Sequence, residues 1–156
     1  MRTVRILSCG LLLLAVTVSP VRADDPCLGD EEEKSAKAAV AALTKAEQAG
    51  RPAELFMAYR SILGNECLDR YDKTALSRAK SALPKLGREL AKAAEVKGLW
   101  YSPDPVRGDG KTSAFRYFET IGDYADANRV MMKAVQAKPD DLVLFTAAWG
   151  VDENRW

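Results

Sequence analysis

The chain contains no histidine, and none of its three cysteines belongs to a CxxC pair. Without histidine, Ser-His-Asp and Cys-His nucleophilic centres, histidine general bases and histidine metal ligands are all excluded. Without CxxC spacing, the usual zinc and thioredoxin-like redox motifs are missing as well. We therefore expect neither a bound cofactor nor a metal.

A complete phosphate-binding loop is also absent. Gly110-Lys111-Thr112 has the ending of such a loop, but the motif requires a glycine where Pro105 stands and a strand before it. Nucleotide binding is not expected.

The first residues have the pattern of a secretory signal peptide. Arg2 and Arg5 give a basic start without any acidic residue, and an apolar stretch covers 6–18 before the small residue Ala23. The alternative is an uncleaved membrane anchor, which needs about 20 apolar residues, and Pro20 interrupts this stretch too early. We predict cleavage near Ala23 and a periplasmic or secreted protein.

Removal of 1–23 changes the charge balance of the chain. This segment holds three of the 23 basic residues and none of the 22 acidic ones, so 24–156 carries 20 basic against 22 acidic residues. A net charge of −2 gives no overall footprint for nucleic acid. The length of 24–156 fits one domain with a single modest core.

Two cysteines, Cys27 and Cys67, remain after cleavage, because Cys9 leaves with the signal. In an oxidising compartment such a pair predicts a disulfide. Helical patterns over 30–49 and 52–63 predict an antiparallel hairpin with Cys27 just before its start and Cys67 just after its end. A redox or metal role for this pair is the alternative.

Apolar residues recur at three- and four-residue steps through most of the chain, and strand-like alternation is almost absent. From 73 to 97 this phase continues across Pro84, which favours one bent helix or two nearly collinear ones. The apolar line along this segment consists of Leu76, Ala79, Leu83, Leu86, Leu90 and Ala93.

The same segment carries a basic stripe, since Arg78, Lys85 and Lys92 are seven residues apart and share a face. Two interpretations remain open. The stripe is either a solvated face whose lysine stems cover apolar surface, or a docking patch for an anionic partner.

Residues 98–112 form one long irregular connection with two prolines and three glycines. Loops of this length inside a compact domain are uncommon and often functional. Trp100 and Tyr101 either plug the end of the core or act as binding hot spots.

Residues 111–144 resemble a tetratricopeptide repeat. The positions that carry the resemblance are Ala114, Phe118, Gly122, Tyr124, Ala127, Met131, Ala134 and Pro139, although Phe115 stands where the family usually has a small residue. A degenerate echo covers 36–64, and the 72 residues from Gly50 to Gly122 are close to twice the family period of about 34. The resemblance implies an all-α fold of antiparallel helical hairpins stacked as a short TPR-like α-solenoid.

In that family the first helix of each repeat lines a groove that binds peptides or protein surfaces. The corresponding positions here are Lys37, Thr44 and Gln48, followed by Thr112, Arg116 and Thr120. The resemblance also implies that Ala127 is a packing residue and that Arg129 lies on the outer face, where its removal should matter little.

The last residues, 140–156, form an apolar helical stripe of Leu142, Phe145, Ala148 and Trp149. Such a helix caps the core of a repeat array. A partner site, a homodimer contact through Phe145 and Trp149, or a truncated longer array are the alternatives, because the segment is more apolar than a cap requires.

Two functional classes follow. The first is a non-catalytic exported adaptor or assembly factor that binds another envelope protein or peptide. The second is a small periplasmic enzyme or a cofactor- or metal-carrying helical protein. Catalysis would need an Asp/Glu pair that the sequence does not single out.

Overall fold

The computed structural model describes residues 27, 29–141 and 144. The described residues form helices and no strand, so the predicted all-α class is confirmed. The helices are α1 (Asp30–Ala49), α2 (Pro52–Leu63), α3 (Leu68–Tyr71), α4 (Lys73–Val96), α5 (Ala114–Thr120) and α6 (Tyr124–Ala137).

The hairpin of α1 and α2 begins and ends where the sequence predicts. Four acidic residues fill the first turn of α1, where the positive end of the helix dipole favours them. Gly50 ends α1 in the left-handed conformation with φ 62°, and its N–H donates to the Ala46 carbonyl. Pro52 then starts α2, because the first turn of a helix does not need its missing N–H.

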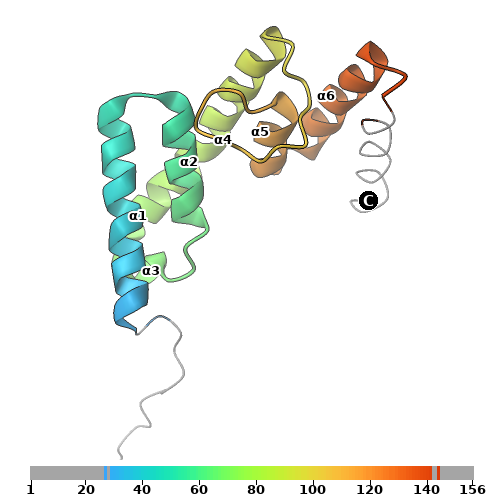
Figure 1. Ribbon diagram of the computed structural model, residues 1–156. Helices are drawn as coiled ribbons and strands as arrows, with labels where there is room; N and C mark the ends of the chain where they lie inside the picture. Colours follow the sequence, from blue (N-terminus) through green and yellow to red (C-terminus); the bar gives the residue numbers. More distant parts are fainter. Residues whose placement is uncertain (1–26, 28, 142–143, 145–156) are drawn as a thin grey trace, which may run out of the picture.

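The longest helix, α4, joins the two halves of the molecule. It runs diagonally from the α1–α2 hairpin toward α5 and α6 (Figure 1), and it contacts α2, α3 and α5. Its start is capped by Asp72, whose Oδ1 accepts a 2.8 Å hydrogen bond from the Ala75 N–H. Pro84 lies inside this one helix, as the continuous apolar phase predicts.

The buried face of α4 differs from the predicted leucine line. Leu76, Leu86 and Leu90 are only partly buried at the flanks of the core, and Ala93 is exposed. Small residues dominate the fully buried positions, which are Ala75, Ala79, Leu83, Gly87, Ala91 and Ala94. Ala79 and Leu83 are thus predicted correctly, whereas the other buried positions lie one residue away from the predicted line, because closely approaching helices select small side chains.

Gly87 marks the closest approach. A Cβ added there would lie 2.5 Å from Ile121 Cγ2 and 3.0 Å from Phe56 Cε2. Phe56 belongs to α2, and Ile121 directly follows α5. At Gly87, α4 therefore lies too close to α2 and to the residue after α5 to admit a larger side chain without a shift.

Each long helix packs against the next one in the chain: α1 on α2, α2 on α4, α4 on α5, and α5 on α6. The core runs through this row. Its largest fully buried side chains include Phe56, Phe118, Leu43 and Met131. Phe56 meets Tyr117 edge to face, with ring centroids 5.1 Å apart.

In α6, Ala127 and Ala134 are buried at 1% and 5% exposure, as the repeat resemblance implies for packing residues. Arg129 is exposed, as expected of a residue on the outer face, but it also contacts its neighbours. Its guanidinium lies 2.7 Å from Glu95 Oε1 and 2.7 Å from Asp126 Oδ1, and 5.8 Å from the Phe118 ring centroid. Arg129 thus links α6 to the end of α4.

Candidate functional site

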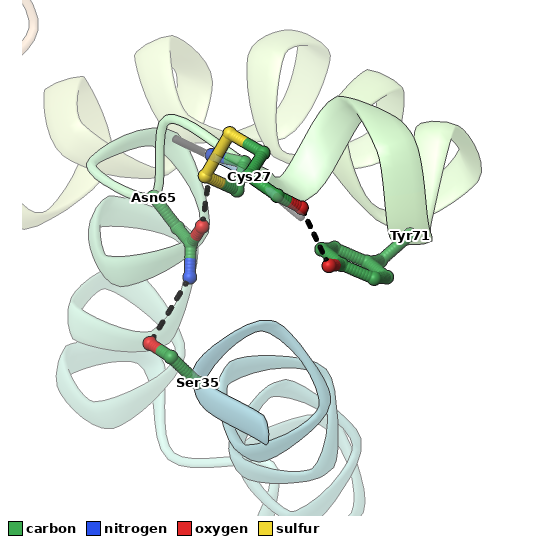
Figure 2. The surroundings of a disulfide bond; sticks show 5 residues. Cys27, Ser35, Asn65 and Tyr71 are labelled. Carbon is green, nitrogen blue, oxygen red and sulfur yellow. Dashed lines mark hydrogen bonds between the residues drawn. A yellow bond between two sulfur atoms is a disulfide. The ribbon is translucent and has the colours of Figure 1, made fainter. Parts of the chain in front are cut away.

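The disulfide corner lies where α1 begins and α2 ends. Cys27 and Cys67 are bonded, with Cα atoms 5.2 Å apart, so the predicted pairing is confirmed. Around the bond, Asn65 accepts from the Cys67 N–H and donates to Ser35 Oγ, while the Tyr71 hydroxyl donates to the Cys27 carbonyl at 2.8 Å (Figure 2). The disulfide and the Tyr71 hydrogen bond attach Cys27 to α3 and the residue before it, and Asn65 joins the turn after α2 to α1.

Beside the disulfide lies an open polar depression of about 460 Å³. Carboxylates from α1 and the turn after α2 line it, together with serine and asparagine side chains. In the part of the chain that the structure describes, no three Cys, Asp or Glu side chains converge as potential metal ligands.

The basic stripe is exposed to solvent: Arg78, Lys85 and Lys92 all lie on the surface of α4. Its charge is partly neutralised by neighbouring helices. Arg78 Nη1 lies 3.1 Å from Glu47 Oε1 of α1, and the nearby Arg88 pairs with Asp123. Lys85 and Lys92 have no ion-pair partner among residues 29–141. Two cations therefore remain available for an anionic partner.

Trp100 and Tyr101 line a half-open hollow at the other end of the molecule. This cavity of about 100 Å³ is bounded by Gly98, Trp100, Tyr101, Ala134, Ala137, Lys138 and Leu144. Both aromatic residues are half-buried, and the Tyr101 ring packs on Phe115 at a centroid distance of 5.3 Å. The two residues thus close one end of the core and border a hollow with both polar and apolar lining, while their role as binding hot spots stays a prediction.

The connection over 98–112 is a compact Ω-type loop whose two ends are fastened together. The Ala114 and Phe115 N–H groups donate to the Leu99 and Trp100 carbonyls at 2.8 and 3.1 Å. Farther along, Thr112 Oγ1 accepts from the Arg107 N–H and donates to the Arg107 carbonyl. The loop is therefore an ordered part of the surface, built mainly from its own hydrogen bonds.

Arg116 and Thr120, the proposed groove positions of α5, are engaged within the chain. Arg116 Nη1 pairs with Glu119 at 2.8 Å, and Nη2 donates to the Pro103 carbonyl at 2.7 Å. Thr120 Oγ1 donates to the Arg116 carbonyl. On α1, the corresponding Thr44 hydroxyl donates to the Val40 carbonyl. The loop thus contacts Arg116, one of the positions at which the resemblance implies an open groove.

Electrostatics tie α4 to α6 most strongly at Glu95. Hydrogen bonds from Arg129 and Lys133 outweigh the effect of burial and lower the pKa of Glu95 to about 2. In the middle of the core, burial raises the pKa of the Tyr117 phenol, and the nearby Asp109 carboxylate acts in the same direction. Asp109 of the loop consequently lies within electrostatic reach of α5.

Sequence reasoning missed Val106, which is only 7% exposed although it lies in the loop. The signal was present: Val106 is a single branched aliphatic residue among prolines, glycines and charged residues. The terminal candidates Phe145 and Trp149 lie outside the described residues. Leu144, just before them, is buried beside the cavity at Trp100 and Tyr101.

Among the described helices, none has the length and apolar character required to cross a membrane. No protein-family model, curated protein or solved structure matches the chain. Its function is therefore inferred from the chemistry and geometry of its own residues.

Proposed function

We propose that the protein is a non-catalytic, exported adaptor or assembly factor with a TPR-like arrangement of helices, which binds another envelope protein or a peptide. Two features support the proposal. The helices follow one another in a row, each packed on the next, so the molecule offers a large surface for its size. The residues that suit a binding anchor also gather at one end of this row.

The observation that carries the proposal is the cavity at Trp100 and Tyr101. At about 100 Å³ it is much smaller than a typical small-molecule site of roughly 300–1,000 Å³. A hollow of this size suits one side chain of a protein partner, whose apolar part would lie against the Trp100 and Tyr101 rings. Half-buried aromatic residues at its edge are typical of interface hot spots.

The basic stripe offers a second contact, which increases the association rate instead of slowing dissociation. Lys85 and Lys92 are exposed and without ion-pair partners in the described ranges, so their charges attract an anionic surface at long range. Exposed charges of this kind chiefly increase the association rate and its salt dependence.

The test is capture from envelope extract with tagged mature protein, followed by measurement of the stoichiometry of the eluted complex. We expect one partner in a fixed molar ratio. Trp100→Ala should reduce the recovery of this partner. The control is Lys80→Ala, which should not reduce it, because Lys80 is exposed on α4 and has no ion-pair partner among the described residues. Catalytic turnover or a bound metal in purified protein, with no stoichiometric partner, would favour the enzyme or carrier class.

A further inference from the structure

Residues 102–109, which we call the strap, cross from the end of α4 over two other helices. The loop that contains them turns back across α5 toward α2 (Figure 1). Gly108 lies beside α2, where a Cβ added to it would be in ordinary van der Waals contact with Glu54 Cγ at 3.6 Å and Met57 Cγ at 3.9 Å. On α5, Arg116 binds the Pro103 carbonyl. The strap thus rests on a surface to which both helices contribute.

Apart from the two hydrogen bonds between Arg107 and the buried Thr112 hydroxyl, few contacts hold the strap in place. Val106 is its one buried side chain, while Pro103, Asp104, Pro105 and Arg107 are exposed. Within the described chain, the 2.7 Å bond from Arg116 Nη2 to the Pro103 carbonyl is the one hydrogen bond that joins the strap to a helix. One anchored side chain and one bound carbonyl are also the means by which a protein holds an extended peptide.

The two prolines of the strap add to this likeness. Pro103 and Pro105 have no N–H and fix φ near the value of an extended polyproline segment. The backbone between them therefore needs few hydrogen bonds from its surroundings. A proline-rich segment from another protein could lie on the same surface without leaving buried donors unpaired.

We propose that the α2–α5 face beneath the strap is a peptide-binding surface that the strap itself occupies in the free protein. Its partner is an extended, proline-rich segment with a branched aliphatic residue three positions after the residue whose carbonyl Arg116 binds. This inference rests on the proposed adaptor function, and it specifies the kind of peptide segment that one partner would supply.

Two details fit exchange of the strap for such a partner. Arg116 Nε is buried and has no acceptor among the described residues, so the strap leaves one donor of this guanidinium unused. Gly110, directly after the strap, has φ 72°, with no atom within 4 Å of an added Cβ. A glycine in an open position such as this suits the end of a segment that changes its place.

The test supplies the strap as a separate molecule. In the full chain, residues 103–108 are replaced by an equally long Gly-Ser sequence, and a fluorescein-labelled peptide of residues 101–111 is the probe. We expect anisotropy titrations to show binding to this variant, and at least tenfold weaker binding to the parent. In the parent the tethered strap competes at an effective concentration in the millimolar range.

Two matched changes test the predicted contacts. A peptide with Val106→Asp should bind the strap-replaced protein at least tenfold more weakly, because it would bury a charge. Arg116→Gln in the strap-replaced protein should weaken binding of the unchanged peptide. Equal binding of both peptides, or a variant with parental helical circular dichroism that does not bind the peptide at millimolar concentration, would overturn the inference.

A second variant covers the case in which the replacement does not fold. Val106→Ser keeps the strap but removes its anchor, so this protein should bind the peptide more tightly than the parent does. Equal affinities would again overturn the inference. Capture of a stoichiometric envelope partner by the parent is independent of all these measurements, so the strap can fail as a peptide mimic while the adaptor function stands.

Discussion

Replacement of Gly87 by alanine sets two effects of opposite sign against each other. In a helix interior, alanine is about 1 kcal/mol more favourable than glycine, so an open site would be stabilised. At Gly87, however, the new Cβ would lie 2.5 Å from Ile121 Cγ2 and 3.0 Å from Phe56 Cε2. Ile121 Cγ2 is bonded directly to its Cβ, so it cannot move away like the end of a long side chain.

Overpacking of a tight core contact costs about 1–3 kcal/mol. After the gain in helix propensity of about 1 kcal/mol, we expect a net loss of up to about 2 kcal/mol for Gly87→Ala. In an Ile121→Ala background the main clash is absent, so the same substitution should become neutral or stabilise by up to about 1 kcal/mol.

Urea denaturation followed by circular dichroism measures both effects, and the four proteins form a double-mutant cycle. A stabilisation of about 1 kcal/mol by Gly87→Ala in the parent protein would refute the reasoning. It would mean that α4 does not approach α2 and the end of α5 as closely as described.

Three further predictions concern stability. The bond between Cys27 and Cys67 closes a separation of 40 residues, so Cys27→Ser/Cys67→Ser should lower the free energy of unfolding by up to about 4 kcal/mol; intact mass before and after reduction checks the bond, and two free thiols would contradict it. Because the pKa of Glu95 is lowered from 4.5 to about 2, its stabilising effect is complete above about pH 4.5 and is lost as the pH falls toward 2; the stability advantage of parent over Glu95→Gln should shrink across that window, and a constant advantage would count against the ion pair. Ala127→Leu should lower the free energy of unfolding by about 1–3 kcal/mol, because it overpacks a buried helix contact. Arg129→Ala should lower it more than the exposed control Lys80→Ala, which should stay within about 0.5 kcal/mol of the parent. Equal losses for Arg129→Ala and Lys80→Ala in denaturant melts would show that the Arg129 contacts add nothing to stability.

Local signals in the sequence predict much of the fold. Gly50 and Pro52 place the turn between the first two helices, since one favours a left-handed helix end and the other suits a first turn. The cysteine pair follows from the hairpin because antiparallel helices bring Cys27 and Cys67 to the same end. Even the passage of α4 through Pro84 follows from an unbroken hydrophobic phase.

Properties that depend on distances between helices were not predictable in this way. The buried face of α4 is set by the space left between α2 and α5, so Gly87 is buried while Leu86 and Leu90 lie at the flank. For the same reason the sequence places Arg129 on the surface but does not predict its ion pair with Glu95, which folding brings within 2.7 Å of it.

For the candidate surfaces, too, the sequence predicts local features but not the contacts that other helices supply. Spacing alone places Arg78, Lys85 and Lys92 on one exposed face, but the partner of Arg78 comes from another helix, 31 residues earlier. Trp100 and Tyr101 were identifiable as unusual loop aromatics. Their cavity was not, because residues from α6 and Leu144 complete it.

The most direct test of the adaptor proposal is the dissociation rate of the captured envelope partner, measured by surface plasmon resonance. If the cavity at Trp100 and Tyr101 receives an apolar anchor, Trp100→Ala should increase the dissociation rate by roughly 30-fold, the equivalent of a 2 kcal/mol hot spot. Lys85→Glu/Lys92→Glu should slow association and reduce its salt dependence, with little change in dissociation. Unchanged association and dissociation rates for both variants, each with parental circular dichroism, would contradict the proposal that the protein binds its partner through these surfaces.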